Sequence, residues 1–335
     1  MQLPQPRGPV SAALADALAG PPRDIPLIEP SDDEDLQLVL HMGYELHYRG
    51  FDGVDDAWEW QPSRIALHQA AERCFEAELR RLVPMPDPVP PAEVPRALAA
   101  VMAADDGPPL SKYLAGRATL EQYREFVTHR SIYHQREADP HTWAIPRLGG
   151  RAKAALVEVQ TDEYGGGRVE RMHAELFRGT MRELGLDDTY GAYLDAAPAA
   201  TLAVNNLMSL FGLHRRLLGA ILGHLAIYEM TSSLPNRRYG NGLRRLGFGP
   251  AATRFYDEHV EADAVHEQIA ANDLCGSYCA DRPEQSSLVL FGAACALALD
   301  ARFAGHLLTR WAAGESSLRA QSDAIGRPLV GALGA

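Results

Sequence analysis

Two histidines and an aspartate near the C-terminal end of the chain have the spacing of metal ligands on one helix. His259, Asp263 and His266 are four and then three residues apart, which places their side chains on one stripe of an α-helix. Nothing in residues 251–271 breaks such a helix. Imidazole and carboxylate groups suit iron, manganese or zinc, so this stripe could supply half of a coordination shell. The alternative is a solvated acidic face that happens to carry two histidines.

A second group of candidates surrounds three consecutive glycines at positions 165–167. Glu163 and His173 are ten residues apart, about 15 Å on an ideal helix, so both could reach one metal cluster only if the glycines bend or unwind the helix. Glycine inside a helix costs about 1 kcal/mol relative to alanine, and a required bend would explain that cost. Glu170 and His173 also form the E-x-x-H pair of ferritin-like di-iron bundles, but no second copy follows downstream.

Two further glutamates lie where a negative charge needs a partner. Glu137 falls in the last turn of a helix predicted over residues 120–138, where its charge opposes the helix dipole; an exposed glutamate is the alternative. Glu229 follows an apolar stretch at residues 221–227, and a carboxylate buried there requires a compensating charge. The candidate metal ligands are therefore Glu137, Glu163, His173, Glu229, His259, Asp263 and His266.

This set of four carboxylates and three imidazoles indicates a particular kind of metal centre. Carboxylates bridge two iron ions and supply charge, while histidines complete each coordination shell. A structural zinc site would instead use thiolates in a closed tetrahedron. No dinucleotide-binding, phosphate-binding or serine-nucleophile motif competes with this interpretation.

The elements that must position these residues are predicted to be helices. Thr119 and Gln122 have capping-box spacing at the start of the first one. A long helix is expected from about residue 199 to 231, ending before Pro235, and an apolar helix over residues 288–311. Because alanine and leucine dominate and only 7% of the residues are aromatic, we expect an all-α fold.

The composition restricts the class of protein. With 335 residues, 46% of them hydrophobic, the chain fits one or two globular domains. A net charge of −12 argues against a nucleic-acid partner. The four cysteines form no CxxC pair, no signal peptide is visible, and the longest apolar run, residues 288–299, is too short to span a bilayer. We therefore expect a cytoplasmic protein that does not bind membranes.

The chain is expected to have three parts. Residues 1–110 are rich in proline and alanine with helical patches, and we interpret them as a helical N-terminal extension that could serve in dimerisation. Residues 111–320 hold every candidate ligand and would form the metal-binding domain. Residues 321–335 read as a short tail.

At this point the sequence resembles a known family, the haem-oxygenase-like di-iron oxidases and oxygenases. The resemblance rests on FYDEHVEADAVHE around His259, on EYGGGR and ERMH before and through His173, and on IYE ending at Glu229. The phrase READPHTWAIPRL, with Glu137, is similar to the N-oxygenase branch, which acts in streptozotocin and azomycin biosynthesis. The resemblance to the family covers roughly residues 110–315.

The resemblance implies a haem-oxygenase-like helical bundle with two iron ions. Glu163, His173 and His266 would hold one ion, and another would be held by the remaining ligands, Glu229, His259 and Asp263. Glu137 would be the extra carboxylate that supports the oxygen-bound di-ferric state. The family's chemistry uses Fe(II), O2 and an external electron donor or redox partner, and passes through a peroxo-di-iron(III) intermediate.

The function implied is N-oxygenation of an amine-, guanidine- or aminoimidazole-type nitrogen to N-hydroxy or nitro, in the biosynthesis of an antibiotic or another specialised metabolite. One alternative is a di-iron oxidase of the same fold that cleaves C–C bonds or desaturates an amino or fatty acid. Another is a metal-free binding protein of that fold. We further expect a homodimer.

Overall fold

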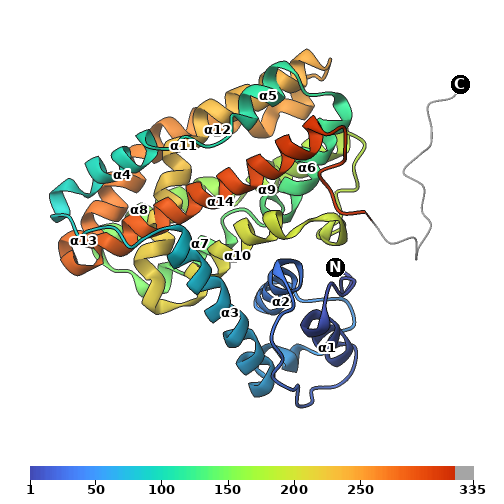
Figure 1. Ribbon diagram of the computed structural model, residues 1–335. Helices are drawn as coiled ribbons and strands as arrows, with labels where there is room; N and C mark the ends of the chain where they lie inside the picture. Colours follow the sequence, from blue (N-terminus) through green and yellow to red (C-terminus); the bar gives the residue numbers. More distant parts are fainter. Residues whose placement is uncertain (321–335) are drawn as a thin grey trace, which may run out of the picture.

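The protein is built from helices, as expected from its sequence. The computed structural model describes residues 1–320, apart from the side chains of residues 261–265, and contains no strand within that range (Figure 1). Its α-helices are α1 (Pro9–Leu18), α2 (Asp33–Glu45), α3 (Pro62–Leu82), α4 (Val94–Ala103), α5 (Leu110–Gly116), α6 (Leu120–His134), α7 (Asp139–Thr142), α8 (Gly150–Glu163), α9 (His173–Glu183), α10 (Ala199–Leu213), α11 (Leu218–Arg245), α12 (Pro250–Gln268), α13 (Ser277–Asp281) and α14 (Ser286–Ala312).

Shorter turns connect some of these helices. A π-helix, Ile269–Gly276, continues directly from α12. The 3-10 turns are Asp56–Trp60, Pro91–Glu93, Ile145–Arg147, Gly165–Gly167, Val169–Arg171, Leu194–Ala196, Arg215–Leu217 and Pro283–Gln285. The predicted tail, residues 321–335, lies outside the described part of the chain.

Helices α11 and α14 form the centre of the bundle, and α11 also packs extensively against α12 (Figure 1). Two glycines let α11 and α14 approach at backbone distance. A Cβ on Gly223 would lie 1.8 Å from the carbonyl oxygen of Val289, and one on Gly292 would lie 2.0 Å from that of Ala220. Only glycine fits at these two contacts.

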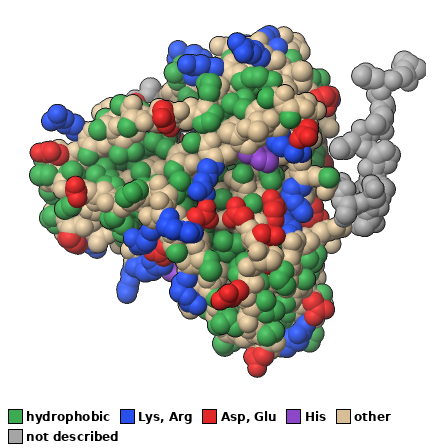
Figure 2. All heavy atoms as spheres, in the orientation of Figure 1, with side chains coloured by type: hydrophobic (Ala, Val, Ile, Leu, Met, Phe, Trp, Pro, Cys, Tyr) green, Lys and Arg blue, Asp and Glu red, His purple; other side chains and the backbone are tan. Residues whose placement is uncertain are grey.

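By length and composition α11 and α14 could each cross a membrane. However, 67% and 56% of their respective apolar windows are buried inside the structure. Such burial is typical of core helices, and length and composition alone are only weak evidence for a membrane span. On the face drawn in Figure 2, acidic and basic side chains are interspersed.

The first three helices lie beside this bundle (Figure 1). Helix α2 packs on α10, and α3 makes a smaller contact with α14. Helix α4 lies within the bundle and packs on α11, α14 and the π-helix. Residues 1–110 therefore contact the helices that carry the candidate ligands at several places.

The predicted capping box is present at the start of α6, but the predicted end of that helix is wrong. Thr119 accepts a hydrogen bond from the backbone N–H of Gln122, whose side chain accepts one from the N–H of Thr119. The helix ends at His134 instead of near residue 138. Ala138 has a left-handed φ of 73°, and Pro140 then lies in the first turn of α7, where proline is well tolerated. Glu137 is thus in a turn.

The predicted long helix is also wrong in its boundaries. The chain turns at residues 214–217, so that α10 and α11 are separate helices. Helix α11 then continues through Pro235 to Arg245. The proline deprives the Thr231 carbonyl of its usual donor, and both residues line a cavity. The apolar helix predicted over residues 288–311 is confirmed as α14.

Candidate metal centre

The structure brings six of the seven predicted ligands together in two adjoining groups. In the first group, one ligand atom from each residue lies within 4.8 Å of the others, and the members are Glu137, Glu163, His173 and His259. The second group meets the same criterion and consists of Glu163, Glu229 and His266. All six side chains are 1–9% exposed. The side chain of Asp263, the seventh predicted ligand, lies outside the described part of the structure.

The three glycines explain how Glu163 and His173 meet. Glu163 ends α8 and His173 begins α9, and all three glycines between them have positive φ, from 61° to 77°. The chain therefore folds back on itself, and Nδ1 of His173 lies 2.9 Å from Oε2 of Glu163. A Cβ on Gly165 would lie 2.5 Å from the carbonyl carbon of Arg171. The predicted bend is present, and Glu170 of the E-x-x-H pair is exposed.

His259 completes the first group from α12. Its Nδ1–H donates to the backbone carbonyl of Phe255 at 2.8 Å, which leaves Nε2 facing Glu137 Oε1 at 3.6 Å. Its ring centroid is 4.3 Å from that of His173. Two imidazoles from different helices therefore lie side by side between the carboxylates.

Glu137 is held by His134, a residue the sequence analysis did not select. Nδ1 of His134 lies 2.9 Å from Oε1 of Glu137. Burial raises the pKa of Glu137, but the nearby His134 and His259 outweigh it and hold that pKa well below its usual value. The carboxylate is therefore ionised. The spacing of three residues between His134 and Glu137 was the available signal in the sequence.

The turn that carries Glu137 is fixed by buried contacts on both sides. Arg136 Nη1 donates to Oε2 of Glu45 on α2 at 2.9 Å, and these two side chains are 1% and 0% exposed. The hydroxyl of Tyr190 donates to the same carboxylate. On the other side, Gln160 Nε2 donates to the carbonyl of Ala138 at 2.9 Å. These contacts hold Ala138 in its uncommon conformation.

His266 in the second group is oriented by Asp162, which the sequence analysis also missed. Nδ1 of His266 faces Glu229 Oε2 at 3.3 Å, while Nε2–H donates to Oδ2 of Asp162 at 3.0 Å. Burial lowers the pKa of His266, but Glu229 and then Asp162 raise it to about 9. A carboxylate behind the outer nitrogen is the usual support of a metal-binding histidine. Asp162 directly precedes Glu163, which was its only signal.

The chemistry of this cluster fits metal ions. Oε2 of Glu137, Oε2 of Glu163, Nδ1 of His173 and Nδ1 of His266 are buried and make no well-oriented hydrogen bond to any described residue. Three buried carboxylates crowded together also require positive charge. A metal ion between these atoms would satisfy both needs, with Glu163 shared by the two groups. The described atoms place His266 with Glu229, whereas the resemblance assigned these two residues to different ions.

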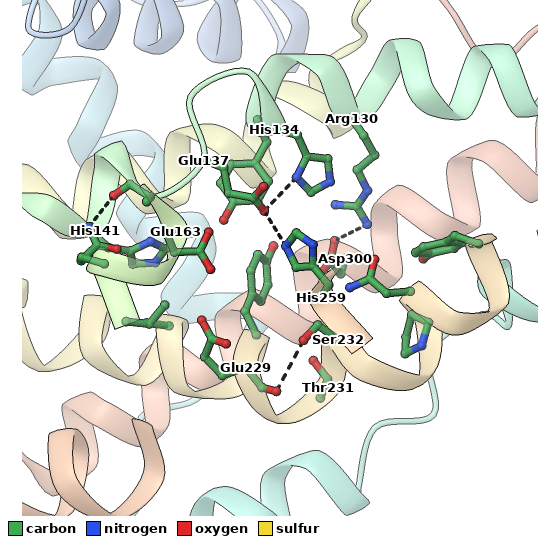
Figure 3. A pocket seen from close by; sticks show the side chains of 18 residues that line it. Arg130, His134, Glu137, His141, Glu163, Glu229, Thr231, Ser232, His259 and Asp300 are labelled. Carbon is green, nitrogen blue, oxygen red and sulfur yellow. Dashed lines mark hydrogen bonds and ion pairs between the residues drawn. The ribbon is translucent and has the colours of Figure 1, made fainter. Parts of the chain in front are cut away.

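A cavity of about 150 Å³ adjoins the cluster. Glu137, Glu163 and Glu229 line one part of it, and Arg130 and Asp300 lie beyond His259 (Figure 3). The cavity is large enough for a small organic molecule and several waters. A small substrate could bind in this cavity, next to the candidate ligands.

Comparison with known proteins shows similarity to several solved chains, one of which is described here, and to a curated protein. The structure, which covers 69% of this chain and 96% of its own, is a domain of unknown function with a heme oxygenase-like fold from Shewanella denitrificans, at a TM-score of 0.51 and 17% identity. This supports the predicted fold. The nitrosourea synthase of Streptomyces achromogenes subsp. streptozoticus is 27% identical over 169 residues. That match covers 50% of this chain and 36% of the synthase.

A family model also matches the chain. The model, described as an iron-containing redox enzyme, matches residues 124–301, which is more than half of the chain and includes all seven predicted ligands. The match confirms the family expected from the sequence motifs. The chain belongs to the iron-containing redox enzyme family, whose members have a haem-oxygenase-like fold.

Proposed function

We propose that this chain is a non-haem di-iron N-oxygenase that uses O2 to oxidise a nitrogen of an amine-, guanidine- or aminoimidazole-type substrate. The product is an N-hydroxy compound or, after further oxidation, a nitro compound, made in specialised metabolite biosynthesis. The observation that carries the proposal is the position of Glu137, whose carboxylate shares one buried group with Glu163, His173 and His259. An extra carboxylate at this position is the feature by which the sequence resembles the N-oxygenase branch.

The similarity to a nitrosourea synthase supports the same class of chemistry. The name of that protein indicates a product that carries an oxidised nitrogen. The matched region is about a third of its length, so its complete activity is not transferred to this chain. What we propose for this chain is the N-oxygenation step alone.

N-hydroxylation has a simple balance. An amine, one O2, two electrons and two protons give a hydroxylamine and one water. The chemistry supplied by two bound iron ions is the reduction of O2 in single-electron steps, and we include an external electron donor in the proposal because the balance requires one. The nitrogen lone pair of the substrate accepts the oxygen atom.

The residues of the chain would hold the metal ions, orient the imidazoles and exclude bulk water. Glu163 and Glu229 would hold metal together with the three histidines, and Glu137 adds a third carboxylate on the side of the cavity. Hydrogen bonds from His259 to the Phe255 carbonyl and from His266 to Asp162 fix the orientation of both imidazoles. Because the ligands are buried, bulk water is kept from the reacting oxygen.

The test is anaerobic titration with Fe(II), followed by O2, a reductant and a panel of amines, guanidines and 2-aminoimidazole. We expect two iron ions per chain and a product that mass spectrometry shows to be heavier by one oxygen atom. Glu137→Gln should lower the yield by roughly tenfold or more, since it removes a charge at the cluster. Glu170→Gln is the matched control, because Glu170 is exposed, and it should equal wild type.

Two outcomes would refute the proposal. A chain that takes up no iron would refute the metal centre. Iron uptake with cleavage of C–C bonds or desaturation of an amino or fatty acid, at a rate that Glu137→Gln leaves unchanged, would establish the alternative oxidase.

A further inference from the structure

A pair of buried histidines joins α7 to α11 at the wall of the cavity. Nε2 of His141 lies 3.2 Å from Nδ1 of His224, and the two residues are 2% and 0% exposed. His141 lines the cavity, whereas His224 does not. Neither residue belongs to the groups that could hold metal. The metal centre therefore does not explain why a second histidine lies behind the first.

Both imidazoles of this pair are neutral near pH 7. Burial lowers the pKa of His141 to about 4, although the charges of Glu163 and Glu137 act in the opposite direction. Burial and then the neighbouring His141 hold the pKa of His224 well below its usual value. A neutral imidazole carries one N–H donor and one acceptor nitrogen. One ring therefore donates to the other, and the direction of this hydrogen bond decides what His141 offers to the cavity.

The surroundings of His224 favour one direction for this hydrogen bond. Its Nε2 atom is buried and has no hydrogen-bond partner among the described residues. A buried N–H without an acceptor is rarer in proteins than a buried acceptor without a donor, so the proton of His224 belongs on Nδ1, which donates to Nε2 of His141. His141 then carries its own proton on Nδ1. No described residue accepts a hydrogen bond from that atom, so this N–H is available to a ligand in the cavity.

A fixed acceptor lies in the same part of the cavity wall. Nε2 of Gln160 donates to the carbonyl oxygen of Ala138 at 2.9 Å and to Oγ1 of Thr142 at 2.7 Å, and His141 lies between these two residues in the chain. Because the Ala138 carbonyl can only accept, the amide of Gln160 has one orientation. Its Oε1 atom is buried and has no hydrogen-bond partner among the described residues. Since Gln160 lines the cavity, this acceptor is also available to a ligand.

Both residues lie close to the candidate metal ligands. Gln160 precedes Glu163 by three residues on α8, and Glu163 is the carboxylate that acts most strongly on His141. Figure 3 shows His141 beside Glu163, on the other side of the cluster from Arg130. A ligand atom bound by the donor and the acceptor would therefore lie next to the cluster.

One donor and one acceptor together distinguish an oxidised nitrogen from its parent. The oxygen of an N-hydroxy group can accept from the N–H of His141, and its O–H can donate to Oε1 of Gln160. A protonated amine or a guanidinium offers donors alone, so the N–H of His141 stays unpaired. A buried polar group that a ligand leaves unpaired costs affinity. The two side chains therefore suit the product of N-hydroxylation better than its substrate.

We infer that Nδ1–H of His141 and Oε1 of Gln160 form a subsite that binds the N-hydroxy group of the first oxidation product and keeps it beside the metal-ligand cluster. His224 is a positioning residue that fixes the tautomer of His141. That this chain makes the N-hydroxy compound rests on the proposed function, whereas the binding preference does not. A product retained in this way is in position for the further oxidation that the proposed function includes.

The first test is isothermal titration calorimetry of the Fe(II)-loaded chain under nitrogen. The probes are guanidine, methylguanidine and N-hydroxyguanidine, which share one skeleton. Methylguanidine has a methyl group in place of the hydroxyl and is the matched probe. We expect N-hydroxyguanidine to bind roughly tenfold or more tightly than methylguanidine, because the methyl group leaves both buried polar atoms unpaired.

Variants assign this preference to the subsite. His141→Phe removes both ring nitrogens and should lower the preference to about twofold or less, whereas His141→Asn, whose amide can place an N–H donor near the position of Nδ1, should keep a larger preference than His141→Phe. His224→Phe should lower the preference as well, because His141 is then free to change its tautomer. His41→Phe is the matched control, since His41 is buried on α2 and does not line the cavity, and it should equal wild type.

The second test determines the position of the proton in wild type, so it does not depend on the folding of the phenylalanine variants. NMR of the iron-free chain with isotope-labelled histidine shows which ring nitrogen carries the proton. We expect His141 to be protonated at Nδ1. N-hydroxyguanidine should shift this resonance more than methylguanidine does.

The inference is overturned if N-hydroxyguanidine does not bind or shows no preference in wild type, if His141→Phe leaves the preference unchanged, or if His141 is protonated at Nε2. N-oxidation of an amine together with any of these results would leave the proposed function intact. The expected preference without N-oxidation would refute the proposed function and support the subsite. If the chain takes up no iron, the same titrations on the iron-free protein decide.

Discussion

Replacing Gly165 by alanine should damage the metal centre without touching any ligand. Gly165 has a φ of 63°, and an added Cβ would lie 2.5 Å from the carbonyl carbon of Arg171 and 2.6 Å from the nitrogen of Met172. Ordinary contacts between carbon atoms are about 3.5–4.0 Å, so this backbone must move by roughly 1 Å. His173 follows directly and would move with it.

The expected loss of metal affinity follows from the tolerance of coordination. Distances between a metal and its ligands are held to within about 0.2 Å, so a displacement of roughly 1 Å removes His173 as an effective ligand. We expect the Kd for Fe(II) to rise by roughly tenfold to a hundredfold, as for loss of a group that orients a ligand. Anaerobic equilibrium dialysis with Fe(II) measures this change.

Gly166→Ala is the matched control. Gly166 has nearly the same φ, 61°, but an added Cβ would meet nothing within 4 Å. Both variants carry the cost of alanine in the left-handed region, about 1–2 kcal/mol, which urea unfolding measures. Only Gly165→Ala should also lose iron. Equal iron affinity in the two variants would show that the glycine bend does not set the ligand geometry.

Three further predictions follow from the same structure. Asp162→Asn should weaken Fe(II) binding by roughly tenfold or more. Because the Asp162 side chain is 61% exposed, the free energy of unfolding in urea should change little. Dialysis and urea unfolding check these two effects, and an unchanged Fe(II) affinity would remove Asp162 from the site. Gly223→Ala should destabilise the protein by about 1–3 kcal/mol through overpacking against the Val289 carbonyl. Its control, Gly305→Ala on α14, has its nearest neighbour at 3.8 Å and should be neutral or slightly stabilising. Equal stabilities in urea would contradict the close contact of α11 with α14. The pKa of His266 is raised from 6.5 to about 9, so protonated His266 stabilises the iron-free fold fully below pH 6.5, and that contribution is lost as the pH rises to about 9. Urea unfolding of the iron-free wild type and of His266→Gln across this range should show a steeper loss of unfolding free energy in wild type. Parallel curves would refute the assignment.

The sequence was sufficient for the fold class and for most of the candidate ligands. An apolar run located α14, and the capping box of Thr119 and Gln122 located the start of α6. Six of the predicted ligands lie in the two groups, since their residue types and spacing along the chain were enough to select them, although Glu137 lies in a turn and not in the predicted helix. The meaning of the glycines at 165–167 was also readable, because three positive φ values in succession suit glycine alone.

Contacts between distant parts of the chain were not readable. The end of α6 is set by Arg136 with Glu45, 91 residues away, and by Ala138 with Gln160. The pair of Arg130 and Asp300 joins positions 170 residues apart. The supporting roles of His134 and Asp162 likewise depend on how helices are placed against one another, which local patterns do not specify.

The ion pair of Arg136 and Glu45 makes helix α2 part of the support of the metal centre. The segment that matches the family model begins at residue 124, yet Glu45 on α2 is the partner of the arginine next to Glu137. A fragment trimmed to the family segment would remove the counter-ion of Arg136 and the aromatic ring of Tyr48 that covers it, one residue from Glu137. Grafting this metal centre onto another scaffold therefore requires α2 to be carried along with it.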